Sequence, residues 1–114
     1  MKIHLDKLDI LFSKYIRLRD KVCQRCGGKA QHSAHFHGRS RRSVRWDEDN
    51  ACALCFGCHI YLDSHPLEKV EFFKTRLGER GFDMLNSRMR RMEKVDRKLL
   101  ELYYQNKIKL LEGK

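Results

Sequence analysis

The chain has 114 residues, 41% of them hydrophobic and 35% charged, a composition that suits one small globular domain and excludes a disordered tail. Its formal net charge of +10 favours a polyanionic partner, nucleic acid above all, although solvated lysines on a small basic protein would give the same balance. No apolar run approaches the roughly 20 residues of a membrane span, and we predict neither a signal peptide nor a membrane anchor.

Residues 4–20 repeat apolar side chains at helical intervals, with lysines and arginines between them, and predict an amphipathic helix packed on the core. The segment CQRCGG follows and predicts a metal-binding knuckle, in which Gly27 and Gly28 supply the positive φ angles of a tight turn. From residue 29 to residue 54 the helical period disappears. We expect a β-hairpin there, with a long basic loop around residues 38–43 and a second strand near residues 52–54.

Helical segments are expected after the hairpin. Residues 59–65 can form about two turns before Pro66, which suits the first turn of a new helix that ends at Gly78 or Gly81. From about Phe82 to Leu111 there is neither Gly nor Pro, which predicts one long amphipathic helix. Its apolar stripe comprises Leu85, Met89, Met92, Val95, Leu99, Leu102 and Leu110. This stripe could form the interface of a homodimer, or it could equally pack on the chain's own core.

Two Cys-x-x-Cys pairs, Cys23 with Cys26 and Cys55 with Cys58, are separated by 28 residues. An odd total of five cysteines without an export signal favours thiolate metal ligands in a reducing cytoplasm over disulfides. Four thiolates complete a tetrahedral shell with no place for a substrate, so we predict one structural zinc. Cys52 with Cys55 is also a valid knuckle, but we expect Cys52 to be a small buried residue on a strand. A thiol oxidoreductase is disfavoured because no βαβ pattern surrounds the pairs.

Three motifs occur in order around the cysteine pairs: AHFHGR with His35, then Asp49-Asn50, then CFGCH with His59. This order resembles the HNH (His-Me finger, ββα-metal) nucleases. The stretch from LFSKYIRLRDKVCQRCG through HFHGRSRRSVRWDEDNACALCFGCHIYLDSHP is similar to the phage NinG (Rap-like) recombination endonucleases and, more distantly, to endonuclease VII-type junction resolvases. The resemblance covers roughly residues 8–80.

The resemblance implies a small α+β fold in one domain, residues 1–114. A zinc-stabilised ββα-metal (treble-clef-like HNH) core at residues 21–66 would lie between an N-terminal helix at residues 1–20 and a helical C-terminal extension at residues 67–114. The implied activity is a metal-dependent DNA endonuclease for branched or recombination intermediates such as Holliday junctions, leaving 5′-phosphate and 3′-hydroxyl ends. It would act in the cytoplasm of a phage-infected or prophage-carrying bacterium.

The same resemblance implies a role for each residue of the three motifs. His35 would be the general base that takes a proton from water. His59 would help to hold one catalytic divalent cation, magnesium or manganese, against the scissile phosphate. Asn50 would pin the hairpin and orient His35 through backbone hydrogen bonds.

The residue before His35 is Ala34, whereas most HNH enzymes have a metal-binding Asp or His there. Asp63 lies four residues after His59, so on a helix the two share a face and could hold the same ion; His37 is a second candidate, for the metal or for a phosphate. Ala34 also keeps open a non-catalytic reading, a zinc-stabilised DNA-binding or adaptor module. The remaining histidines, which we expect to be structural or on the surface, are His4, His32 and His65.

The loop between the predicted strands is rich in cations. It carries Trp46 and four arginines, Arg39, Arg41, Arg42 and Arg45. Guanidinium groups clamp phosphates and an indole can wedge beside a groove, so we predict that this loop contacts DNA. A merely solvated loop is the alternative.

Overall fold

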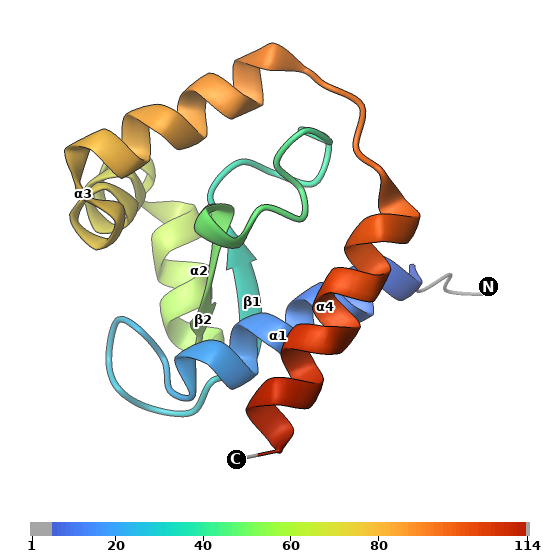
Figure 1. Cartoon of the computed structure of the whole chain (residues 1–114). Helices are drawn as coiled ribbons and strands as arrows, with labels where there is room; N and C mark the ends of the chain where they lie inside the picture. The colour runs from blue at the N-terminus through green and yellow to red at the C-terminus, as the bar shows by residue number, and fades with distance from the viewer. Residues whose placement is uncertain (1–5, 114) are drawn as a thin grey trace, which may run out of the picture.

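The computed structural model describes residues 6–113, in which four helices surround a two-stranded sheet (Figure 1). The order along the chain is helix α1 (Lys7–Asp20), strand β1 (His32–His35), the 3₁₀ turn η1 (Glu48–Asn50), strand β2 (Ala51–Leu54) and helices α2 (Phe56–Ser64), α3 (Pro66–Arg91) and α4 (Arg97–Glu112). The predicted small α+β fold is confirmed at this level. The first predicted positions of the N-terminal helix, His4 and Leu5, lie outside the described residues.

Helix α1 begins where an acidic side chain caps it. The Oδ1 atom of Asp6 accepts hydrogen bonds from the backbone N–H groups of Leu8 (2.8 Å) and Asp9 (3.3 Å). The helix ends at Lys21, which has a left-handed φ of 68° and donates its backbone N–H to the carbonyl of Arg17. As the apolar period predicts, the buried face of the helix carries Leu8, Phe12, Tyr15 and Ile16.

The predicted hairpin is confirmed. Strands β1 and β2 pair antiparallel, with His32 opposite Leu54 and His35 opposite Ala51. Side chains alternate between the two faces of a strand, so His32 and His35, three positions apart, point to opposite faces of the hairpin.

Each face of the hairpin belongs to its own hydrophobic core. One core joins α1 and α4 to the hairpin through Leu8, Phe12, Tyr15, Ile16, Trp46, Ala51, Ala53, Tyr104 and Ile108. The other joins the cysteine knuckle, α2 and α3 to it through Cys23, Ala34, Cys52, Leu54, Cys58, Leu62, Phe73 and Phe82. All four residues of β2 are buried, so this strand is the wall that the two cores share.

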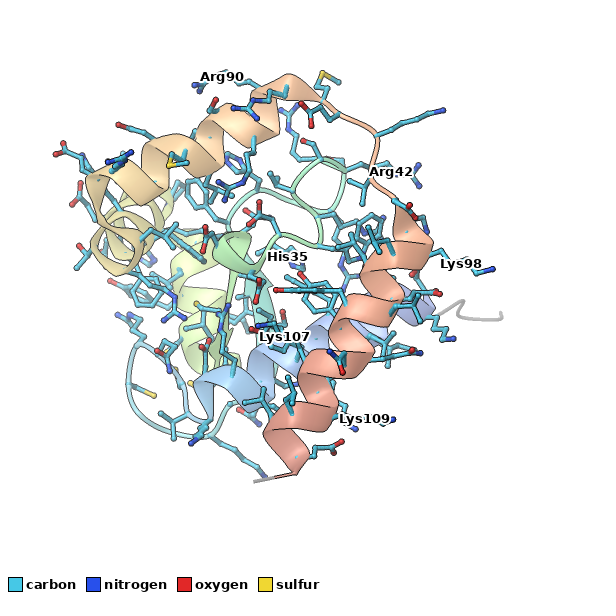
Figure 2. The ribbon with its side chains drawn as sticks, viewed as in Figure 1. His35, Arg42, Arg90, Lys98, Lys107 and Lys109 are labelled. Atoms are coloured by element: carbon cyan, nitrogen blue, oxygen red, sulfur yellow. The ribbon has the colours of Figure 1, made fainter. Side chains whose placement is uncertain are left out.

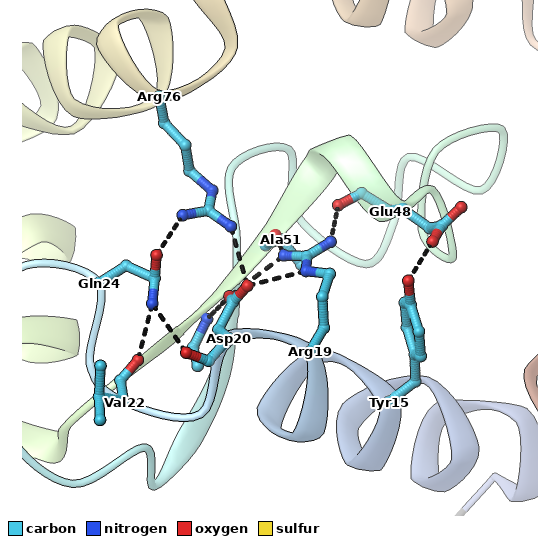
Figure 3. A network of polar contacts seen from close by, with 9 residues as sticks. Tyr15, Arg19, Asp20, Val22, Gln24, Glu48, Ala51 and Arg76 are labelled. Atoms are coloured by element: carbon cyan, nitrogen blue, oxygen red, sulfur yellow. Dashed lines mark hydrogen bonds and ion pairs between the residues drawn. The ribbon is translucent and has the colours of Figure 1, made fainter. Parts of the chain in front are cut away.

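A polar network fixes the knuckle against the C-terminal end of α1 (Figure 3). The buried carboxylate of Asp20 accepts hydrogen bonds from Arg19 Nε (2.8 Å) and Arg76 Nη2 (3.0 Å). The backbone N–H of Ala53 also donates to it (2.8 Å). Burial alone would raise the pKa of Asp20, but these groups hold it below its ordinary value. Arg76 donates further to Gln24 Oε1 (2.8 Å), inside the knuckle, so one network joins α1, β2, the knuckle and α3.

The C-terminal third of the chain corrects the prediction of one long helix. Helix α3 starts at Pro66 as expected and kinks at Gly78 (φ 77°, ψ 161°), but it resumes at once and continues to Arg91. The chain then leaves the helical conformation at Met92 (φ 54°), and α4 starts only after its N-cap Asp96. A continuous helix would project away from the domain, whereas the break lets α4 turn back and cover α1 (Figure 1).

The predicted apolar stripe therefore divides between different surroundings. Leu85 is buried, while Met92 is 80% exposed in the linker. Helix α4 packs on α1 through Tyr104 and Ile108, and its outer face presents the exposed side chains of Leu99, Leu102 and Leu110. Between residues 6 and 113, no helix combines the length and apolar character that crossing a bilayer requires.

Candidate functional site

The four predicted zinc ligands lie together. Cys23 and Cys26 come from the knuckle, Cys55 is the N-cap of α2 and Cys58 lies in its first turn. Their Sγ atoms all lie within 4.8 Å of one another, and those of Cys26 and Cys55 are 3.7 Å apart. Two sulfurs on a tetrahedral zinc, each about 2.3 Å from the ion, are separated by about 3.8 Å. The cluster thus fits a structural zinc, and it confirms the predicted ligand set as one able to hold the ion.

Local backbone geometry directs N–H donors at three of the four thiols, those of Cys23, Cys26 and Cys55. Gly27 has the positive φ (78°) that the knuckle requires, while Gly28 has none and instead donates its N–H to Cys26 Sγ (3.4 Å). The N–H of Cys58 donates to Cys55 Sγ (3.4 Å). Burial by itself raises the pKa of Cys23, but backbone N–H groups directed at its sulfur lower that pKa to about 6. Donors of this kind favour thiolates, the form that binds zinc.

Cys52 is not part of the cluster. It is fully buried in the core beneath α2 and α3, opposite Ala34 in the hairpin register. Burial raises the pKa of its thiol to about 12. The alternative knuckle of Cys52 with Cys55 is therefore wrong, and the expectation of a small buried residue on a strand is confirmed.

Asn50 is the one buried polar residue among those described, and it holds both ends of the basic loop. Its Oδ1 accepts from the backbone N–H of His37 (2.8 Å). Its Nδ2 donates to the carbonyls of His37 (3.0 Å) and Val44 (3.0 Å). Its own carbonyl accepts from the N–H of Phe36 (2.8 Å). Asn50 thus pins the hairpin through backbone hydrogen bonds, which is the geometry expected from the sequence.

His35 lies on the α1 face of the hairpin. Its ring is 5.5 Å from the Phe12 ring between centroids, and its Nε2 is 2.8 Å from the carbonyl oxygen of Arg45. A carbonyl only accepts, so Nε2 carries the proton and Nδ1 keeps a lone pair in the neutral ring. Burial lowers the pKa of His35, and this outweighs the hydrogen bond to Arg45, which raises it. The ring is therefore neutral near pH 7 and has a basic nitrogen.

His59 lies on the opposite face, where it meets His32. The Nδ1 atoms of the two rings are 2.9 Å apart, and His59 Nε2 is 3.4 Å from Asp63 Oδ2. Without an ion, 2.9 Å is the length of an N–H···N hydrogen bond between the two rings. Neighbouring ligands of an octahedral ion, each about 2.1 Å from it, are about 3.0 Å apart, so the same pair also has the spacing of two ligands of one divalent cation. Sequence reasoning missed His32 because only the register of the hairpin brings it next to the start of α2.

Asp63 lies beside His59, on the other side of the imidazole ring from His32. Asp63 shares a helix face with His59, as expected, but its carboxylate lies at Nε2 while His32 lies at Nδ1. Its other oxygen pairs with Lys69 Nζ (2.7 Å). The 3.4 Å between His59 Nε2 and Asp63 Oδ2 also suits two ligands of one ion, so the sharing of an ion by these two residues stays a prediction.

His37 joins neither histidine site. It lies beyond the end of β1, and its Nε2 is 2.7 Å from Asn86 Oδ1 on α3. The structure thus brings together His32 and His59 but separates them from His35, which lies on the other side of the hairpin. His65 matches the structural role expected for it, because it stacks on Tyr61 and its Nδ1 is 2.7 Å from the Tyr61 carbonyl.

The basic loop has an outer and an inner part. The exposed arginines are Arg39, Arg41 and Arg42, and none of them makes an ion pair within residues 6–113. Arg45 instead points inward, where its Nε donates to Asp9 Oδ1 (3.1 Å) and its guanidinium lies over the Trp46 ring. Trp46 is only 4% exposed, and its Nε1 also donates to Asp9 (2.8 Å). This placement corrects the prediction that Arg45 and Trp46 face DNA, because both side chains bond to Asp9 on α1 and Trp46 is part of the hydrophobic core.

Comparisons of this chain with known protein families, with curated proteins and with solved structures gave no match. The four-thiolate cluster is accordingly the part of the site that is established, and the imidazole pair and the basic loop are the features from which a function has to be argued.

Proposed function

We propose that this protein is an HNH-type, metal-dependent DNA endonuclease with a treble-clef-like zinc core. The observation that carries the proposal is the imidazole pair, His32 with His59, whose Nδ1 atoms lie 2.9 Å apart beside the zinc ligand Cys58. The order of elements supports it: a knuckle, a hairpin and a helix that begins with the second cysteine pair. The net charge of +10 suits a DNA substrate.

In this proposal His32 and His59 would hold one divalent cation, magnesium or manganese, and the carboxylate of Asp63 beside Nε2 would orient the ring of His59. When bound, the cation neutralises negative charge that develops on the phosphate and the leaving oxygen. His35 takes a proton from water at Nδ1, since Nε2 is occupied by the Arg45 carbonyl. Arg39, Arg41 and Arg42 hold the phosphate backbone.

The test is a cleavage assay on duplex, flap, fork and four-way DNA with magnesium or manganese. His59→Ala and His32→Ala should each lower the rate about 100-fold, and His35→Ala by a similar factor, as expected for a lost ligand or general base. His65→Ala is the matched control, because this ring lies at the end of the same helix, where it stacks on Tyr61 and lies 2.7 Å from the Tyr61 carbonyl oxygen. Zinc content and far-UV circular dichroism should be unchanged in all four variants. Full cleavage by His59→Ala and His32→Ala would refute the proposal.

A second candidate function is a zinc-stabilised DNA-binding or adaptor module without cleavage. The observation that favours it is the separation of His35 from the imidazole pair: the two lie on opposite faces, and three residues of strand correspond to about 10 Å. Buried Ala34 offers no ligand between them. Tight DNA binding with no cleavage of any substrate, with either metal, would select this candidate.

The biological setting of the proposal follows the resemblance: branched recombination intermediates such as Holliday junctions, in the cytoplasm of a bacterium that carries the phage or prophage. Cutting two strands of a four-way junction favours a homodimer. We assign its interface to the outer leucines of α4, which are Leu99, Leu102 and Leu110. Light scattering should then give a dimer that Leu102→Glu dissociates; a wild-type monomer at assay concentrations would exclude this interface.

A further inference from the structure

A cleft of about 860 Å³ lies between the basic loop, the C-terminal end of α3 and the linker to α4. Figure 2 shows Arg42 on the linker side of the loop and Arg90 on α3. Apart from Arg97, four cations line this cleft: Arg41 and Arg42 from the loop, Arg90 from α3 and Lys94 from the linker. Its volume falls in the range of sites for small organic ligands.

The charge of the cleft is available to a ligand. Within residues 6–113, none of the four cations makes an ion pair with a carboxylate, and Glu93 is the one acidic residue that lines the cleft. Arg97, which also lines it, is already paired with Asp6. An excess of unpaired guanidinium and ammonium groups at the mouth of a cavity favours an anionic ligand.

The apolar part of the lining comes from Met89, Met92, Val95 and Trp46, and two serines, Ser40 and Ser43, also line the cleft. The guanidinium groups of Arg45 and Arg97 lie over the Trp46 ring, 5.0 Å and 4.7 Å from its centre. Planar cations and polarisable methionines offer surfaces against which a flat aromatic ring packs. The cleft therefore combines an apolar site for a ring with cations for a phosphate.

The walls of the cleft are held in place without a ligand. Ser43 Oγ donates to the carbonyl of Met89 (3.1 Å), which fastens the loop to α3. Arg88 donates to Asp47 Oδ2 (2.6 Å) and to Asp49 Oδ2 (3.0 Å), on the far side of the same loop. A preformed site loses less entropy when its ligand binds.

We propose that this cleft binds an unpaired nucleotide of DNA, with its base against the methionine side chains and its phosphate among Arg41, Arg42, Arg90 and Lys94. A continuous duplex keeps its bases stacked inside and presents phosphates alone, whereas an unpaired nucleotide also offers the flat face of a base. The cleft thus selects DNA that contains single-stranded or branched segments. The inference rests on the proposed function only in taking DNA as the partner and does not need cleavage.

The experiment measures binding of the full-length, zinc-loaded protein by fluorescence anisotropy, with no other divalent metal added. The probes are a twelve-nucleotide oligothymidylate and a blunt duplex of the same length. Arg90→Ala combined with Lys94→Ala should weaken single-strand binding about tenfold and lower its salt slope by about 1.4, as expected for two lost phosphate contacts. The matched control, Arg91→Ala with Lys98→Ala, removes the same charge from exposed positions outside the cleft and should weaken it only about twofold.

Met89→Gln separates the apolar part of the site from its charge. It should weaken oligothymidylate binding about fivefold, because a base loses its apolar contact, and leave duplex binding unchanged. The inference would be overturned if the two double variants lost the same amount of affinity for oligothymidylate, or if Met89→Gln weakened binding of both probes equally. Tighter binding of an oligouridylate of the same length would also overturn it. Unaltered melting temperatures exclude misfolding. If His59→Ala loses cleavage but still binds oligothymidylate, the inference about the cleft is supported. If the wild-type protein cuts DNA but does not bind oligothymidylate, the inference about the cleft is refuted and the proposed nuclease function is not.

Discussion

Replacing Asn50 by Ala should destabilise the protein by about 3 kcal/mol. The side chain is fully buried and makes three hydrogen bonds to the loop backbone, one to the N–H of His37 and one each to the carbonyls of His37 and Val44. Each is worth about 1 kcal/mol, and the backbone groups left behind lose their partner where water reaches poorly. For a domain of this size the melting temperature should fall by about 12 °C. The assay is thermal unfolding followed by circular dichroism at a fixed zinc concentration.

Two variants test whether the hydrogen bonds of Asn50 stabilise the protein. Asn106→Ala removes the same side chain from an exposed position on α4 and should change the melting temperature by no more than about 2 °C. Asn50→Asp keeps the acceptor for the His37 N–H but sets a carboxylate against two carbonyls, so it should be as damaging as Ala near pH 7. If Asn50→Ala and Asn106→Ala have the same melting temperature, the three hydrogen bonds of Asn50 make no net contribution to stability. Asn50 then does not anchor the basic loop.

Three further predictions concern the zinc cluster, the buried histidine and the inner arginine. Cys26→Ser, or a strong chelator, should abolish cooperative unfolding, because a zinc ion held by the four thiols would join the knuckle to α2; a chelated protein with an unchanged melting curve would contradict this. Burial holds the folded-state pKa of His35 below its unfolded value of about 6.5, so the unfolded chain binds the extra proton first. The free energy of unfolding should therefore be intact above about pH 6.5 and fall as the pH drops toward the folded-state pKa, and denaturant titrations of His35→Phe should show a smaller fall; an identical fall would contradict the assignment. Arg45→Ala should cost about 2 kcal/mol in such titrations because Asp9 loses its partner, whereas Arg42→Ala should leave stability unchanged and weaken DNA binding; the reverse pattern would contradict the division of the loop.

Local patterns were sufficient to predict the first half of the fold. Helix α1 follows from its apolar period and the hairpin from the loss of that period. The four-cysteine cluster follows from the spacing of the two Cys-x-x-Cys pairs, which is the spacing of ligands that would share one ion. The residues that specify the helix and the hairpin are close in sequence, and the four cysteines share one chemical role as ligands of a single ion.

The features that could not be predicted depend on long-range packing. No Gly or Pro marks the break at Met92, and the apolar stripe continues across it, so local preference favours one helix; the break exists because α4 must reach α1. The arginine-rich segment around Arg45 favours a phosphate contact, and nothing in that segment indicates that Asp9, thirty-six residues earlier, lies beside Arg45. The role of His32 depends on the hairpin register, which the sequence leaves undefined.

The pairing of α1 with α4 has a consequence for biosynthesis. Helix α1 is translated before α4, and its residues Phe12 and Ile16 are covered by Tyr104 and Ile108, which are translated almost a hundred codons later. A nascent chain that already holds zinc at its four cysteines would still expose the apolar face of α1 to chaperones and to other nascent chains. Termination of translation before the codon for Tyr104 should therefore release a fragment that can still bind metal but aggregates through the exposed apolar face of α1.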